Sequence, residues 1–199
     1  MIPKNAVFLD RDGVINELVY HKEAGIIDSP FSLKHFRIIK GAEKALRLFK
    51  KLGFLAVVVS NQPGIAKGHF SKKDLDEMTG KMNAFFKSRK LSLDGVYYCL
   101  HHPESKKASL RKNCSCRKPK PGLLKKAAKD LAISLKGSYM IGDSWVDIKA
   151  GKKAGCKTIM LVDRHKAEVA KLLACKKVLP DFYAKDLSDA AVIIKNMER

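Results

Sequence analysis

The stretch Ala6-Val7-Phe8-Leu9-Asp10-Arg11-Asp12-Gly13 decides the fold, because a short apolar run passes directly into two acids. Four apolar residues in a row predict a strand buried on both faces, as in a parallel sheet. In open parallel sheets, ligands bind beyond the carboxyl ends of the strands. Asp10 and Asp12 are therefore expected at a binding edge, although an Asp-x-Asp pair alone also suits an ordinary turn.

The rest of the chain alternates between strand and helix patterns. Further strands are predicted at 54–59, 96–98, 139–141 and 158–162, and helices at 42–52, 71–90, 122–133, 145–154 and 187–197. This alternation predicts a parallel sheet covered by helices on both faces. We expect an α/β fold, a Rossmann-like three-layer sandwich in one domain over 1–199. The long irregular stretch 99–122 is expected to be a functional or metal-stapled loop.

The composition favours anionic partners. The 199 residues carry a formal net charge of +20, from 40 Lys+Arg against 20 Asp+Glu. Phosphorylated small molecules or nucleic acid would suit this charge, although lysines spread along the whole chain also suit a solvated surface. No aromatic residues alternate with the lysines as in a single-strand groove, so nucleic acid is not expected. Without an apolar run of about 18 residues or a signal-peptide pattern, a cytoplasmic protein is expected.

Four of the five predicted strands are followed by polar or charged residues that are expected at one edge of the sheet. Besides the two acids, these are Ser60, Asn61, Arg117, Lys118, Asp143 and Asp147. A carboxylate can attack a phosphate anion only where their repulsion is cancelled, as by Mg2+ held on carboxylate oxygens. A lysine and a hydroxyl can stabilise the phosphoryl oxygens, and a protonated acid can donate to the leaving oxygen. The set therefore suits phosphoryl transfer.

Together these residues resemble the haloacid dehalogenase superfamily of phosphatases. The stretch from Phe8 to Asn16 resembles its first motif, Val59-Ser60-Asn61-Gln62 its second, Lys118 its third, and Ile141-Gly142-Asp143 with Asp147 its fourth. More narrowly, the chain resembles the histidinol-phosphate and D-glycero-D-manno-heptose-1,7-bisphosphate phosphatase branch. The resemblance covers roughly residues 6–162.

The resemblance implies a role for each residue of the set. Asp10 would attack phosphorus and become phosphorylated, while Asp12 would protonate the leaving oxygen and then activate water. Mg2+ would be held by the Asp10 carboxylate, the Asp12 main-chain carbonyl and Asp143. The remaining roles are phosphoryl binding by Ser60 and Lys118, substrate contact by Asn61 and Arg117, and support of the metal site or a helix cap by Asp147.

Three of the five cysteines lie in the irregular loop. Cys99-x-His101 and Cys114-x-Cys116 match the same branch, and three thiolates with one imidazole predict a closed, structural zinc site. His102 could ligate in place of His101. The zinc would fix the backbone just before Arg117 and Lys118. The other two cysteines, Cys156 and Cys175, are expected to be small buried hydrophobic residues.

The segments 64–68, 101–103 and 118–122 look more like the heptose bisphosphate enzymes than the histidinol-phosphate ones. The predicted reaction is thus Mg2+-dependent release of the 7-phosphate from D-glycero-D-manno-heptose 1,7-bisphosphate. These enzymes usually carry an Asp-x-Gly-Tyr-like stretch, whereas Glu17-Leu18-Val19-Tyr20-His21 here lacks the glycine. Histidinol phosphate stays an alternative substrate for that reason.

Two other functions compete with a small-molecule phosphatase. Polynucleotide 3'-phosphatases resemble the chain around Asn61-Gln62-x-Gly64-Ile65, but the zinc loop is not part of that resemblance. A non-catalytic anion-binding module is disfavoured because the residues that catalysis would need are all present. They are Asp10, Asp12, Ser60, Lys118 and Asp143. No insertion between the motifs is large enough for a cap domain, so an open site is expected. A monomer is expected as well.

Overall fold

A computed structural model of the protein describes residues 3–162 and 178–198, so Cys175 lies outside the described residues. Its centre is a six-stranded sheet in the order β5-β4-β1-β6-β7-β8, in which every neighbouring pair is parallel. The strands are β1 (Ala6–Leu9), β4 (Leu55–Asn61), β5 (Gly95–Cys99), β6 (Tyr139–Gly142), β7 (Lys157–Leu161) and β8 (Phe182–Ala184). The predicted parallel sheet is confirmed.

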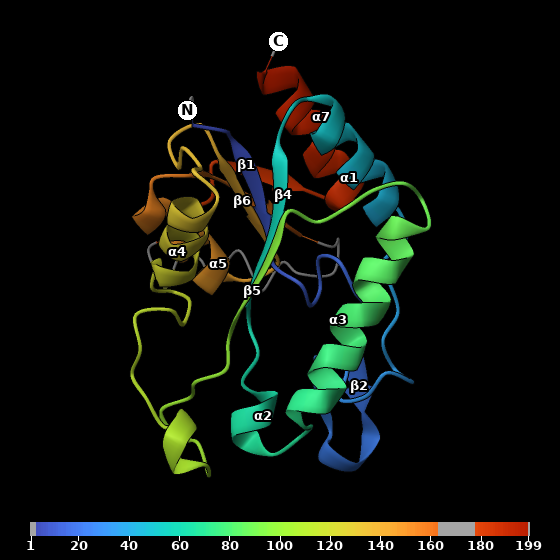
Figure 1. The fold of residues 1–199 in the computed structure, drawn as a ribbon, viewed down its shortest axis with the longest axis vertical. Coiled ribbons are helices and arrows are strands. Elements are labelled where there is room, and N and C mark those ends of the chain that lie inside the picture. Colours follow the sequence, from blue (N-terminus) through green and yellow to red (C-terminus); the bar gives the residue numbers. More distant parts are fainter. Residues whose placement is uncertain (1–2, 163–177, 199) are drawn as a thin grey trace.

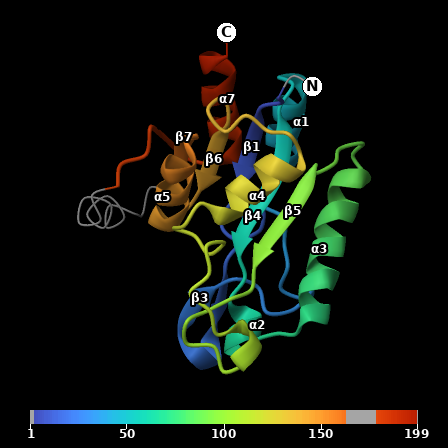
Figure 2. The same ribbon diagram turned by 60° about the vertical axis from the view of Figure 1, so that its left-hand side comes forward.

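Helices cover both faces of this sheet (Figures 1 and 2). One layer holds α1 (Ala42–Lys51), α3 (Lys72–Lys87) and α7 (Leu187–Met197), and the other holds α4 (Gly122–Asp130) and α5 (Trp145–Ala154). Alternation within the strands feeds both layers, since Val7 and Leu9 belong to one core cluster and Ala6 and Phe8 to the other. The three-layer α/β class is thereby confirmed.

Two helices are shorter than their patterns predict. Helix α3 begins after the predicted N-cap Ser71, whose hydroxyl accepts from the backbone N–H of Asp74, but it ends at Lys87 rather than 90. Lys90 adopts a φ of 57°, and Ala132 beyond the end of α4 adopts 52°. A residue in the left-handed backbone conformation cannot continue a right-handed helix. The chain therefore turns back toward the sheet after both α3 and α4.

The structure adds short elements that the sequence patterns did not predict. They are the antiparallel strands β2 (Val19–His21) and β3 (Ile26–Asp28), the turn η1 (Lys22–Ala24), helix α2 (Gly64–Lys67), the turn η2 (Ala108–Leu110) and strand β8. Elements of three or four residues are too short to show a period.

The β2–β3 hairpin lies beyond the carboxyl edge of the sheet, close to α2 (Figure 1). Phe31 contacts the hairpin and the segment just after α2, because its ring stacks on His21 at 3.6 Å between centroids and meets the edge of His69 at 4.5 Å. In the described part of the chain no insertion forms a separate cap domain, which agrees with the expected absence of a large cap. None of the described helices is long and apolar enough to cross a lipid bilayer.

Candidate active site

Three neighbouring strands bring the predicted catalytic residues to one place. Strand β1 lies between β4 and β6, so Asp10 after β1 sits between Ser60 near the end of β4 and Asp143 after β6. The backbone N–H of Asp10 donates to the Ile141 carbonyl at 3.0 Å, which extends the ladder up to the acid itself. Parallel pairing therefore explains why residues 133 positions apart in sequence, Asp10 and Asp143, meet.

Lys118 is the buried cation of the site, with only 2% of its surface exposed. Its Nζ lies 2.9 Å from Asp10 Oδ1 and 2.5 Å from Asp147 Oδ1, and it donates to the Val59 carbonyl at 2.8 Å. Burial alone would lower the pKa of Lys118, but the two carboxylates outweigh burial and raise that pKa above its ordinary value. Lys118 is thus held charged beside Asp10.

Asp147 is fully buried and has two sets of partners. Its Oδ2 accepts from the backbone N–H and the hydroxyl of Ser144, at 3.2 and 2.9 Å, and so caps helix α5, one of the two predicted possibilities. Its Oδ1 faces Lys118. Burial, with the negative charge of Asp10, raises the pKa of Asp147 to about 6 against the pull of Lys118. Two carboxylates sharing one lysine leave the more buried acid under-compensated.

Asn61 is committed to the backbone of Lys118. Its Nδ2 donates to the Lys118 carbonyl and its Oδ1 accepts from the Lys118 N–H, both at 3.0 Å. The side chain was predicted to contact substrate, yet one of its two N–H donors and one of its two acceptor positions are already used to hold the lysine. Neighbouring Ser60 is buried, and its Oγ accepts a weaker bond from Gln62 Nε2 at 3.2 Å.

Asp12 is surrounded by donors that the sequence analysis did not assign. Arg11 Nη2 donates to Oδ1 at 2.9 Å, Asn16 Nδ2 to the same oxygen at 2.9 Å, and Gln62 Nε2 to Oδ2 at 2.6 Å. Asn16 and Gln62 fall inside the recognised motifs, so the motifs offered a signal for them. Nothing in the sequence indicated that Arg11 would be buried.

The acidic residues form a group suited to a hard cation. Carboxylate oxygens of Asp10, Asp143 and Asp147 all lie within 4.8 Å of one another. Asp143 rests against Gly13, where an added Cβ would come 2.3 Å from its Oδ2, and Gly13 has a φ of 78°. A side chain at position 13 would therefore displace this acid. Because Asp147 already accepts from Ser144 and faces Lys118, Asp10 and Asp143 fit a divalent cation better.

The cysteine loop closes into a compact cluster. The sulfur atoms of Cys99, Cys114 and Cys116 lie 3.1 to 3.5 Å apart, and His101 Nδ1 lies 3.4 Å from the sulfur of Cys116. A tetrahedral zinc with bonds of about 2.3 Å to sulfur needs spacings slightly wider than these. The donor set therefore fits zinc, with His101 as its imidazole. His102 instead accepts from the Glu104 N–H at 3.2 Å.

Arg117 directly follows the last cysteine of the cluster, and its side chain is partly held by the cysteine loop. Its Nη1 donates to the His101 carbonyl at 3.2 Å, so one arm of the guanidinium is tied to the cysteine loop. The expected substrate contact is neither made nor blocked by this bond. Away from the site, Cys156 is buried as predicted, and burial raises the pKa of its thiol to about 12.

The chain is similar to known proteins along nearly its whole length. A family model described as HAD-hydrolase-like matches residues 115–190. A D-glycero-beta-D-manno-heptose-1,7-bisphosphate 7-phosphatase of Pasteurella multocida is 37% identical over 195 residues, covering 98% of this chain and 99% of its own length. The protein of that name from Escherichia coli K12 is 43% identical over 157 residues, covering 79% of this chain and 78% of its own.

A solved structure is similar over almost the same span. It is the D,D-heptose 1,7-bisphosphate phosphatase from B. bronchiseptica in complex with magnesium and phosphate. Its TM-score is 0.78 at 25% identity, and the match covers 97% of this chain and 99% of that one.

Proposed function

We propose a substrate from the family of the chain, which belongs to the haloacid dehalogenase superfamily of phosphatases and to its D-glycero-D-manno-heptose-1,7-bisphosphate 7-phosphatase branch. The proposed substrate is D-glycero-D-manno-heptose 1,7-bisphosphate. The enzyme is a phosphoric monoester hydrolase, and the 7-phosphate is the ester we propose it cleaves. The chemistry is carried by one observation, the placement of Lys118 between Asp10 and Asp147 at the carboxyl edge of the sheet. The substrate is carried by the identity to the named relatives along nearly the whole chain.

The first half-reaction transfers the phosphoryl group to Asp10. A carboxylate oxygen of Asp10 forms a bond to phosphorus while the bond from phosphorus to the sugar oxygen breaks. Asp12 gives its proton to that leaving oxygen. Lys118, held charged by two carboxylates, and the Ser60 hydroxyl bind the non-reacting phosphoryl oxygens as charge moves across them.

The second half-reaction frees Asp10. Water bonds to phosphorus, the bond from phosphorus to Asp10 breaks, and Asp12 takes a proton from the water. Asp12 thereby returns to the form it had before the first half-reaction, so one acid serves both steps.

Two metal sites complete this proposal. Asp10, Asp143 and the Asp12 main-chain carbonyl would hold Mg2+, which when bound supplies the positive charge that lets one anion approach another. Cys99, His101, Cys114 and Cys116 would hold a structural zinc, whose four protein ligands leave no open position. The zinc cluster ends at Cys116, directly before Arg117 and Lys118, and so would fix the start of that segment.

Arg117 is proposed to bind the second phosphate of the substrate. Only one of its arms is tied to the His101 carbonyl, and a guanidinium can grip phosphate oxygens with two parallel bonds. Holding the remote phosphate would orient the reacting ester. We further propose a monomer with one domain over 1–199, working in the cytoplasm on a phosphorylated sugar rather than on nucleic acid.

A phosphate-release screen tests the proposal. The panel holds the heptose 1,7-bisphosphate, its monophosphates, histidinol phosphate and a 3'-phosphorylated oligonucleotide, each assayed with added Mg2+. The heptose bisphosphate should give the highest kcat/KM. Asp10→Asn should lower turnover by at least about 1000-fold without unfolding the protein, because the nucleophile is lost.

Two outcomes would contradict different parts of the proposal. Faster turnover of histidinol phosphate or of the oligonucleotide would overturn the substrate. Near-normal activity in a correctly folded Asp10→Asn protein would overturn the mechanism, whichever substrate was best.

A further inference from the structure

Arg11 is a buried cation to which the mechanism above gives no role. Its side chain is completely buried, and its Nε and Nη2 donate to Asp12 Oδ1 at 3.2 and 2.9 Å. The same Nη2 reaches Asp12 Oδ2 at 3.2 Å. Arg11 therefore touches both oxygens of the acid, whereas Asn16 and Gln62 each touch one.

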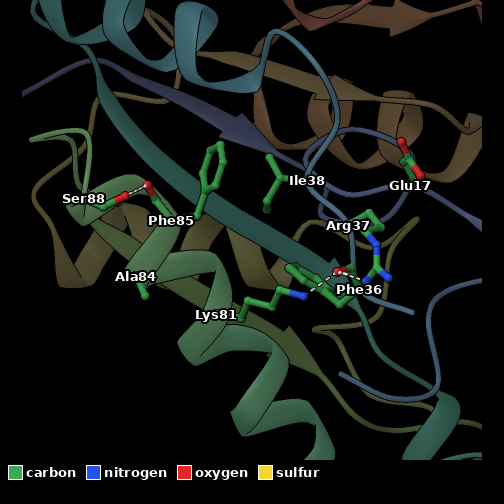
Figure 3. Close-up of a pocket in the computed structure, with 8 residues that line it drawn as sticks. All are labelled: Glu17, Phe36, Arg37, Ile38, Lys81, Ala84, Phe85 and Ser88. Carbon is green, nitrogen blue, oxygen red and sulfur yellow. Dashed lines mark hydrogen bonds between the residues drawn. The ribbon is translucent and has the colours of Figure 1, made fainter. Parts of the chain in front are cut away.

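The guanidinium is itself held by two aromatic rings. Its central carbon lies 5.8 Å from the centre of the Phe36 ring and 5.6 Å from that of Tyr98. Helix α3 fixes both, because Lys81 donates to the Phe36 carbonyl at 2.9 Å and Thr79 shares a 3.0 Å hydrogen bond with the Tyr98 hydroxyl. Figure 3 shows the first of these contacts in a pocket that Phe36 also lines. The contacts with these two rings leave the Arg11 guanidinium little freedom to move.

Stability alone does not account for this arrangement. Taking a guanidinium out of water is costly, and a buried ion pair is often no more stabilising than well-packed apolar residues. Within the described residues, Arg11 Nη1 is buried without a hydrogen-bond partner, which adds to that cost. The Arg11 guanidinium instead points at Asp12, the side chain that is proposed to transfer the proton.

We propose that Arg11 is a positioning residue, which fixes the Asp12 carboxyl group where it meets the leaving oxygen of the ester. The proposal rests on the proposed function, because it concerns the half-reaction in which Asp12 gives a proton to the sugar oxygen as that oxygen separates from phosphorus. A fixed acid loses no orientational freedom at the transition state, and small misplacements are costly there. Arg11 acts through Asp12 and does not touch the substrate.

The test uses esters that differ in their need for a proton. The alkyl oxygen of a sugar phosphate must be protonated as it leaves, whereas p-nitrophenolate is stable as an anion. The quantity compared is kcat/KM, which covers the steps up to phosphorylation of Asp10 and not the hydrolysis that follows. Arg11→Lys keeps the charge but loses the fork that reaches both oxygens.

We expect Arg11→Lys to lower kcat/KM for the heptose bisphosphate by about 30-fold, which is part of the roughly 100- to 10,000-fold that a general acid contributes. For p-nitrophenyl phosphate the loss should be less than about threefold. Phe36→Leu, which keeps Arg11 and removes one of its rings, should show the same difference between esters to a smaller degree. In an Asp12→Asn background, Arg11→Lys should have no further effect on the sugar ester.

Arg89→Lys is the matched control. Arg89 also lies over a ring, with its central carbon 3.7 Å from the centre of Phe85, and also pairs with an acid, Glu43 at 2.9 Å, but none of its partners belongs to the site. Both esters should be unaffected by this change. Circular dichroism and thermal unfolding of each variant show whether it is folded, and Phe36→Leu carries the test if Arg11→Lys is not.

Each possible failure points to a different claim. Equal losses on both esters, or an undiminished effect of Arg11→Lys in the Asp12→Asn background, would overturn the positioning role of Arg11. Wild-type protein that releases no phosphate from the heptose bisphosphate would overturn the proposed substrate. Asp12→Asn with equal losses on both esters would overturn the role of Asp12 as the acid.

Discussion

Replacing Asn61 by alanine tests whether this residue binds substrate or holds Lys118. The change removes two hydrogen bonds of 3.0 Å between the Asn61 amide and the Lys118 backbone. At about 1 kcal/mol each, they amount to about 2 kcal/mol. For a chain of this length that loss lowers the midpoint of thermal unfolding by about 4 to 8 °C. If the displaced Lys118 stabilises the transition state by about 2 kcal/mol less, kcat falls about 30-fold.

Asn61→Asp sharpens the test. The aspartate keeps an oxygen that accepts from the Lys118 N–H, but its second oxygen faces the Lys118 carbonyl, so two acceptors oppose each other. Asn61→Asp should therefore be less stable than Asn61→Ala. Asn113→Ala serves as the control, because Asn113 is exposed and accepts from the Lys120 side chain at 2.6 Å, away from the catalytic lysine.

The assays are phosphate release over a range of substrate concentrations and thermal unfolding by circular dichroism. A residue that holds Lys118 should show a fall in kcat together with a lower unfolding temperature. A raised KM with unchanged kcat and unchanged unfolding temperature would refute this reasoning and return Asn61 to the substrate.

Three further predictions concern the metals, Arg117 and Cys156. Protein prepared without chelators should carry about one zinc per chain by elemental analysis, and Cys114→Ser should lose it; zinc-free wild-type protein would refute the cluster assignment. Arg117→Ala should lower kcat/KM more for the bisphosphate than for a matching monophosphate, whereas equal losses would remove its assignment to the second phosphate. Native Cys156, whose thiol pKa burial raises to about 12, should resist alkylation at about pH 8 and react only after unfolding, as measured by peptide mass spectrometry. The Cys156 thiol loses its proton at lower pH in the unfolded chain than in the folded one. Ionisation of this residue should therefore favour unfolding only above about pH 9.

The sheet and its two helix layers could be predicted because their signals are local. The apolar runs before Asp10 and Ser60 are long enough to indicate buried strands, and parallel pairing then brings their ends together. The β2–β3 hairpin gave no such signal. Its facing residues Tyr20 and Ile27 are 60% and 70% exposed, so its apolar residues do not follow the burial pattern of a core strand.

The site was predictable in its members and not in its connections. The motifs named Asp10, Asp12, Lys118 and Asp143, but the partner of Asn61 lies 57 residues away and is a backbone group. Arg11 stands between two acids, a context that in sequence suggests an exposed salt bridge. Only the folded chain brings the rings of Phe36 and Tyr98 to it, and neither ring is marked by any pattern around position 11.

The two carboxylate oxygens of Asp147 have different partners, and this limits which residues can replace Asp147 as the sequence diverges. Oδ2 starts helix α5 through Ser144, while Oδ1 meets Lys118. When a phosphoryl group draws the lysine toward itself, the helix keeps its cap, so the exchange of partners need not unwind α5. Asparagine offers one acceptor oxygen where two are used, and glutamate would meet the close packing of Gly142 against this side chain. Position 147 therefore links a structural and a catalytic requirement, and a library of variants selected for activity should return aspartate there even where the acid takes no part in bond breaking.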